Sequence, residues 1–165
     1  MTEKIREKIN SAQWIFERTL GWIAAAEIKV AAICAIDTAM LGGLGALFIT
    51  EWKKSAWANL FGIMALLCLF AGIICAALVL IPRLHGGPSQ SLLYFGKVAD
   101  LSSCTYEKML LDVSDEQLLS DWAAQIHFNA RVAQKKHEWV RKCLYWSILG
   151  AFPWLGAIFA ILASR

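Results

Sequence analysis

The chain has 165 residues, of which 58% are hydrophobic, and its formal net charge is +3. An ordinary soluble domain is close to half apolar, so this composition indicates a membrane protein. The small positive charge comes with no run of lysine and arginine long enough to follow a phosphate backbone, which excludes nucleic acid as a partner.

Residues 1–29 are too polar to lie within a bilayer, and their apolar side chains recur at helical spacing. At roughly 100° per residue these side chains form one stripe, which predicts an amphipathic cytoplasmic helix leading into the first span. The stripe either packs against the polar block of the chain or lies on the membrane surface. Trp14 and Trp22 are candidate anchors near the headgroups. The members of the stripe are Ile5, Ile9, Ala12, Phe16 and Ile23.

Two apolar runs follow, over 30–49 and 56–81. A helix needs about 20 apolar residues to cross the hydrocarbon core, and both runs meet that length. They predict two transmembrane helices within residues 30–81, joined by a short extracytoplasmic turn. Pro82 is expected to end the second span because proline disrupts a helix interior.

Asp37 is the only charged residue of the first run and lies near its middle. A carboxylate at lipid depth is costly and should face protein or water, so Asp37 is a functional candidate. Pairing with a hydroxyl such as that of Thr38 or Thr50 is the structural alternative. Glu27 and Lys29 mark the cytoplasmic mouth of this span, and they point to different helix faces, so they form no local ion pair.

Most of the charges lie in residues 82–143, between the second and third apolar runs. Within this block, residues 103–113 are predicted to be helical. Ser114 and Gln117 match a capping box, so a long helix is expected to begin there and to continue into the third span, over 144–165. Such a helix would transmit a shift in the polar block directly to the membrane.

The distribution of lysine and arginine predicts the orientation. Five of these residues precede the first span, with Lys29 at its mouth, and eight lie between the second and third, whereas the turn has two and the tail has one. This pattern places the amino terminus and the 82–143 segment in the cytoplasm. The carboxy terminus is then outside.

The sequence contains no motif of a hydrolase, a metalloprotease or a phosphate-binding loop, and its three histidines are scattered. The five cysteines show no C-x-x-C and no metal spacing, so they are interpreted as small packing residues. We therefore expect neither an enzyme nor a bound cofactor or metal ion.

Gln125, Asn129 and Lys136 share one direction on the long helix, within about 40° of one another. They border its apolar stripe, which is interpreted as core. Polar groups at the edge of a core can line a partly buried ligand site. A hydrated flank of the helix is the alternative.

The order of these motifs resembles the membrane-type effector proteins of Pycsar antiphage defence systems, over nearly the whole chain. Glu27 stands where that family is expected to have Asp, and Val30 where it is expected to have Ala. The similarity rests on A-E-I-K-V at 26–30, two spans ending in Pro82-Arg83, L-L-Y-F-G at 92–96, Y-E at 106–107, Q-I-H-F-N-A at 125–130, and Lys135-Lys136 ahead of the final span.

The resemblance implies an effector in the inner membrane that senses cyclic CMP or cyclic UMP, made by a partner cyclase on phage infection. Binding would then impair the membrane, so that the cell stops growing or dies. Lys29, Arg83 or Lys136 would meet the phosphate. Gln125 and Asn129 would read the base or the ribose, because an amide both donates and accepts. Tyr94, Phe95 or Tyr106 would stack on the ring. Glu27 and Asp37 are candidates for the membrane function.

Together these features predict an all-α membrane protein with three transmembrane helices and a cytoplasmic helical segment between the second and third. Three spans are few for a pore, so we expect a homo-oligomer with Gly42, Gly43 and Gly45 at its contacts. Two alternative functions fit the same features. One is a small ungated ion channel or transporter subunit in which Asp37 lines the path, and the other is a membrane scaffold for a cytoplasmic partner.

Overall fold

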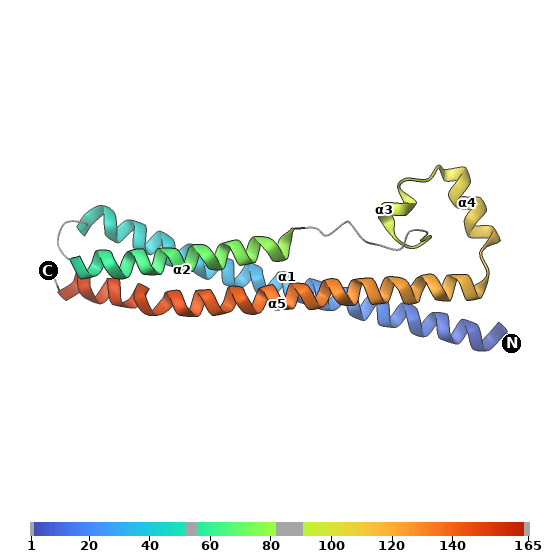
Figure 1. Ribbon diagram of the computed structural model, residues 1–165, viewed down its shortest axis with the longest axis horizontal. Helices are drawn as coiled ribbons and strands as arrows, with labels where there is room; N and C mark the ends of the chain where they lie inside the picture. The colour runs from blue at the N-terminus through green and yellow to red at the C-terminus, as the bar shows by residue number, and fades with distance from the viewer. Residues whose placement is uncertain (1, 52–55, 82–90, 164–165) are drawn as a thin grey trace. The chain divides into compact units, whose positions relative to one another are not determined.

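The computed structural model describes residues 2–51, 56–81 and 91–163, so the predictions at Pro82, at Arg83 and at the turn over 52–55 lie outside it. Throughout this described part the chain forms helices and no strand. Three of the helices are long and apolar enough to cross a membrane, and they contain the three apolar runs that predict the spans. The helices are α1 (Thr2–Glu51), α2 (Ala56–Leu80), α3 (Phe95–Val98), α4 (Ser103–Asp112) and α5 (Asp115–Ala163) (Figure 1).

The two longest helices are each far longer than a bilayer requires. α1 has 50 residues and α5 has 49, so each extends about 75 Å at 1.5 Å per residue, against a hydrocarbon core of about 30 Å. Each therefore combines an apolar span and a long polar portion in one helix.

The start of α5 is the predicted capping box. The Ser114 N–H donates to Gln117 Oε1 at 3.0 Å, and the Gln117 N–H donates to Ser114 Oγ at 3.2 Å. These reciprocal bonds satisfy backbone donors that a helix start would otherwise leave without partners. The helix then continues to Ala163, past Pro153 in its interior. The prediction of one helix from the capping box into the third span is confirmed.

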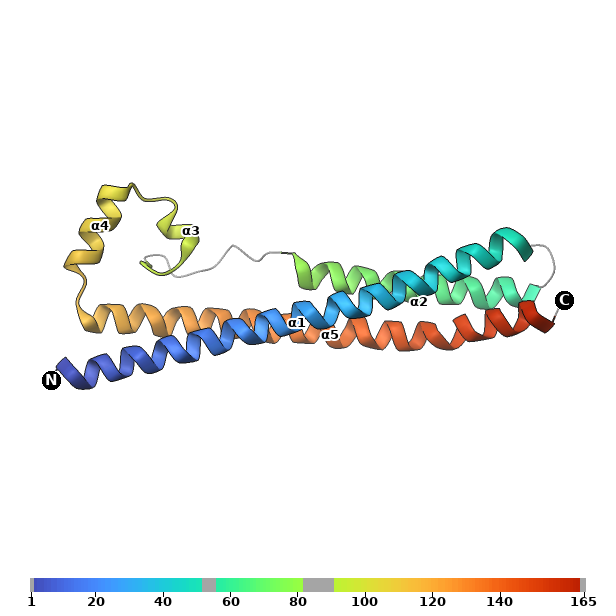
Figure 2. The same ribbon diagram turned by 180° about the vertical axis from the view of Figure 1, so that it is seen from behind.

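The chain folds as two units. The first unit comprises residues 1–25 and 82–135, and the second comprises residues 26–81 and 136–165. The two long helices α1 and α5, labelled in Figure 2, contribute to both units, whereas α3 and α4 belong to the first and α2 to the second. All three apolar runs of the sequence fall within the second unit.

In the first unit, the amino-terminal half of α1 packs against the polar half of α5. Ile9 and Ala12 on the predicted stripe are buried. Phe16 packs on Trp122 edge to face, with ring centroids 5.2 Å apart. The interpretation that the stripe packs against the polar block is therefore confirmed. Trp14, by contrast, is 62% exposed.

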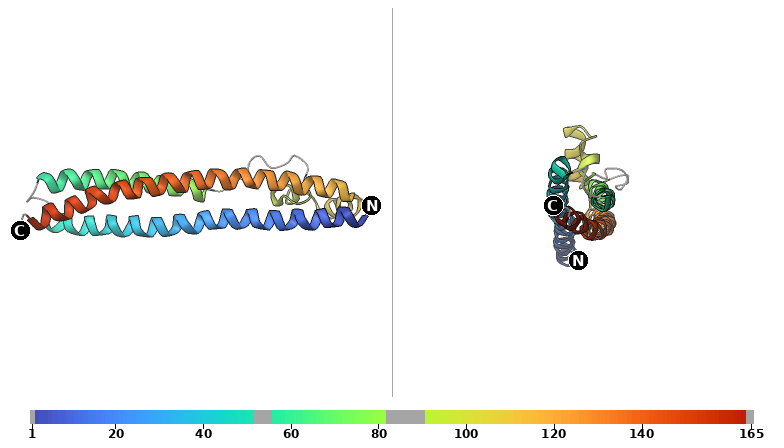
Figure 3. Two further views of the ribbon diagram at one scale, coloured as in Figure 1. Left: turned by 90° about the horizontal axis from the view of Figure 1, so that it is seen from below. Right: turned by 90° about the vertical axis from the view of Figure 1, so that its left-hand side faces the viewer.

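In the second unit, α1, α2 and α5 run alongside one another (Figure 3) and meet through small side chains. Gly150 shows why small residues are needed. A Cβ at this position would lie 3.1 Å from Cys68 Cβ and from Leu69, so glycine lets α5 approach α2 closely. Large apolar side chains such as Phe152 are exposed, as suits a surface facing lipid. The main core cluster consists of Ala26, Val30, Cys75, Ala76, Val79, Val140 and Cys143.

Candidate functional site

Residues 91–94 form a hydrogen-bonded bend in the first unit. Ser91 Oγ accepts from the backbone N–H of Leu93 at 3.1 Å and of Tyr94 at 2.9 Å, which is how a serine stabilises a turn that it begins. Gln125 Nε2 donates to the same oxygen at 3.0 Å, and the Gln125 side chain is only 2% exposed. Gln125 therefore fixes the bend to α5.

Both backbone polar groups of Leu92, within this bend, are also held by side chains. Its N–H donates to Asp121 Oδ2 at 2.8 Å, and its carbonyl accepts from the Tyr106 hydroxyl at 3.2 Å. Because Tyr106 lies on α4 and Asp121 on α5, the two bonds tie the bend to both helices. The position of the bend is thus set by residues far from it in the sequence.

A groove of about 540 Å³ lies beside the 91–94 bend, lined by residues of the bend, α4 and α5. This volume falls within the range of about 300–1,000 Å³ that is usual for small-molecule sites. Its apolar lining includes Met109 and Val113. Its polar lining consists of Ser91, Asp112, Gln117, Ser120 and Asp121.

Carboxylates dominate the chemistry of this groove. Asp112 and Asp121 can only accept hydrogen bonds when ionised, so they suit a ligand that offers hydroxyl, amino or imino protons. Among the described residues that line it, the groove has no lysine or arginine. Asp121 Oδ1 is buried without a hydrogen-bond partner in the described part of the chain. The groove therefore suits a ligand that donates hydrogen bonds better than it suits an anion.

Of the ligand residues predicted from the sequence, those that the structure describes do not line this groove, and Arg83 lies outside the described residues. Gln125 and Tyr106 contribute indirectly, because their hydrogen bonds hold the bend that forms one wall of the groove. Asn129 Nδ2 donates to the Gln125 carbonyl of its own helix at 2.9 Å. The Tyr94 ring centroid lies 6.2 Å from that of Phe128. The sequence gives no local signal for the acidic lining, because the bend, α4 and α5 that carry it meet only in the folded chain.

Asp37 in the second unit is fully buried, and its Oδ2 accepts from Ser147 Oγ at 2.7 Å. Pairing with a hydroxyl is therefore confirmed, but the partner is a serine 110 residues away on α5 rather than Thr38, whose side chain is exposed. Gly72 provides the room, because a Cβ there would lie 2.9 Å from Asp37 Oδ2. Asp37 Oδ1 has no hydrogen-bond partner among the described residues.

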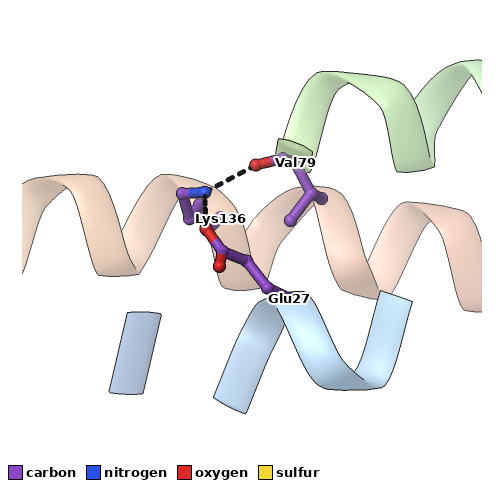
Figure 4. A network of polar contacts seen from close by, with 3 residues as sticks. All are labelled: Glu27, Val79 and Lys136. Carbon is purple, nitrogen blue, oxygen red and sulfur yellow. Dashed lines mark hydrogen bonds and ion pairs between the residues drawn. The ribbon is translucent and has the colours of Figure 1, made fainter. Parts of the chain in front are cut away.

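Lys136 in the second unit forms a three-way contact (Figure 4). Its Nζ donates to Glu27 Oε1 at 2.6 Å and to the Val79 carbonyl at 2.7 Å, and the residue is only 5% exposed. Lys29, near Glu27 on α1, is exposed instead. The expectation that Glu27 and Lys29 form no local pair is consistent with this arrangement.

The shared direction of Gln125 and Lys136 on α5 does not give them shared partners. Gln125 bonds Ser91 within the first unit, and Lys136 bonds Glu27 and Val79 within the second. Both side chains are buried, so the alternative of a hydrated flank is wrong for these two residues.

A family model described as the Pycsar effector protein domain matches residues 11–163 of the chain. The matched range includes the groove, the Asp37 contact and the three-way contact of Lys136. Comparison with curated proteins and with solved structures finds no match.

Proposed function

The chain belongs to the Pycsar effector family of antiphage defence, and from this premise we propose that it binds cyclic CMP or cyclic UMP in the cytoplasm and then impairs the inner membrane. A partner cyclase would supply the nucleotide on infection. Damage to the membrane would arrest growth or kill the cell. In this proposal the amino terminus and the 82–143 segment lie in the cytoplasm, where the nucleotide is made, and the carboxy terminus lies outside.

The continuity of two helices supports the proposal that a ligand in the first unit controls the membrane spans of the second. α1 and α5 each begin in the first unit, beside its groove or its core, and end in the second unit, which holds the apolar spans. A ligand that binds one arrangement of the first unit more tightly than another shifts the population toward it by that difference in affinity. Each long helix provides a covalent path for such a shift to reach the membrane.

The groove beside the 91–94 bend is the proposed site for the ribose and the base. Asp112 would accept from a ribose hydroxyl or from the base edge, Asp121 would hold Leu92 in the wall of the groove, and the phosphate would stay outside the acidic lining. Gln125 and Tyr106 would act by holding the wall of the groove. Three kinds of direct contact stay predictions. They are contacts of Lys29, Arg83 and Lys136 with the phosphate, of Asn129 with the base or ribose, and stacking of the base on Tyr94.

Binding of labelled cyclic CMP and cyclic UMP to purified protein tests this proposal, with cyclic AMP as the control ligand. Asp112→Asn should weaken binding of the preferred pyrimidine nucleotide at least tenfold, which corresponds to about 1.4 kcal/mol. Asp100→Asn is the matched control, because Asp100 is exposed and does not line the groove. Equal affinity in the two variants would remove the groove as the site.

The direct contacts from α5 have a separate test. If Asn129 and Lys136 touch the nucleotide, alanine at both positions should lower its affinity. Unchanged affinity in that double variant would reject these two contacts and leave the groove as the site to pursue.

An ungated channel centred on Asp37 is the second candidate, because one buried oxygen of this carboxylate has no partner among the described residues. Such a channel would conduct ions without any nucleotide, and Asp37→Asn would change its conductance. Ion flux measured in the absence of ligand separates this candidate from the effector.

A further inference from the structure

Glu27, Val79 and Lys136, here called the Lys136 clamp, come from three different helices. Glu27 lies on α1, Val79 on α2 and Lys136 on α5, and the Lys136 ammonium bonds both of the others at 2.6 and 2.7 Å (Figure 4). An ammonium group donates up to three hydrogen bonds from one point charge, so a single lysine can join two partners in this way.

The clamp lies where the chain passes between the two units. The unit boundaries fall at 25/26, 81/82 and 135/136. Each member of the clamp is within three residues of a different one of these crossings. A change that travels along the backbone from the first unit into the second must therefore pass a segment that the clamp holds.

The clamp also stabilises the end of α2. The last carbonyls of a helix lack partners within it and carry partial negative charge, which a nearby cation satisfies. α2 has no basic residue in its own last turn, and Val79 is the second-last residue of the helix. Lys136 supplies from α5 the positive charge that α2 does not carry.

The two charged members differ in their access to water. The Lys136 side chain is 6% exposed, whereas the Glu27 side chain is 44% exposed. Water can replace Lys136 around Glu27, but the buried ammonium needs its protein partners. If the pair opens, Glu27 is therefore the partner that leaves, while the ammonium keeps its bond to the Val79 carbonyl.

We propose that the Lys136 clamp holds the second unit in its resting arrangement, and that Lys136 is a positioning residue whose release transmits the ligand signal to the spans. The link to a ligand rests on the proposed function. The existence of the clamp does not depend on that function, because its hydrogen bonds form entirely within the second unit.

Hydrogen exchange of the ligand-free protein in lipid nanodiscs tests whether the clamp holds the end of α2. Lys136→Met keeps the unbranched side chain and removes the charge, so amides of residues 77–81 should exchange at least tenfold faster. Glu27→Gln should give a smaller increase, because the bond from Lys136 to Val79 stays possible. Lys29→Met is the matched control and should exchange as the wild type does, since Lys29 is exposed.

Growth of cells that lack any cyclase tests whether opening the clamp activates the protein. Lys136→Met and Glu27→Gln should slow growth without nucleotide, whereas the wild type and Lys29→Met should not. A role limited to stability would lower the amount of protein in the membrane and would not produce ligand-free arrest. If Lys136→Met fails to accumulate in the membrane, Glu27→Gln carries both tests.

If residues 77–81 exchange at the wild-type rate in the variants that fold, the clamp does not hold the end of α2 and the proposal is wrong. Faster exchange without ligand-free arrest would overturn its role in signalling. Wild-type protein that binds neither pyrimidine nucleotide would contradict the proposed function instead, and the exchange result would still decide whether the clamp exists.

Discussion

Asp37 is accommodated among three apolar helices by two neighbours, each from a different helix. Ser147 on α5 donates to its Oδ2, and Gly72 on α2 leaves the space that this oxygen occupies. A carboxylate at this depth is costly unless protein groups replace its water. The space at Gly72 is therefore as important to the site as the hydrogen bond.

Gly72→Ala should destabilise this contact. The added Cβ would lie 2.9 Å from Asp37 Oδ2 and 3.3 Å from Ser147 Oγ, so one of these groups must move. Overpacking of this kind costs about 1–3 kcal/mol, which thermal unfolding in detergent can measure as a lower melting temperature. Gly21→Ala is the control, because a Cβ there meets nothing within 4 Å and alanine favours a helix by up to about 1 kcal/mol. Equal melting temperatures for the two variants would contradict the close approach at Gly72.

At the scale of elements, the parts that could be predicted were those with a local signal. The capping box at Ser114 and the uninterrupted pattern after it predicted α5, and the apolar runs predicted the spans. The contacts that define the sites have no such signal. Glu27 and Lys136 are 109 residues apart, and nothing in the spacing of either helix indicates that they meet. The same holds for Gln125 and Ser91, 34 residues apart.

The continuity of α5 predicts that loosening it between the groove and the spans uncouples the two. Arg131 and Lys135 are exposed on α5, so glycine at both positions lowers helix stability by about 1 kcal/mol each without removing core contacts. This variant should bind the nucleotide as the wild type does but give a weaker membrane response. Alanine at both positions removes the same charges at no cost to the helix and should respond normally. An equal loss of response in both double variants would assign the effect to charge.

For the whole molecule, the open glycine surface of α1 predicts self-association. A Cβ at Gly42 or Gly45 would meet nothing within 4 Å in a single chain, so this surface is free to receive another helix. The detergent-solubilised protein should be a homo-oligomer by light scattering. Leucine at both Gly42 and Gly45 should lower the measured mass of the assembly by weakening self-association. Leucine at Ala77, which is exposed on α2, is the control. A monomer with and without nucleotide would contradict this prediction.

The groove lies in one unit and the apolar spans lie in the other, and α1 and α5 run through both units. The proposed function requires that a cyclic pyrimidine nucleotide controls the state of the second unit. Such control requires a membrane effect that depends on the ligand, and not only binding.

The most direct test is ion leak across liposomes that contain the purified protein, followed with a potential-sensitive dye as nucleotide is added. We predict that cyclic CMP or cyclic UMP collapses the potential and that cyclic AMP leaves it intact. Leak that is already present without nucleotide would point to an ungated channel. A stable potential with all three nucleotides would contradict the proposed function.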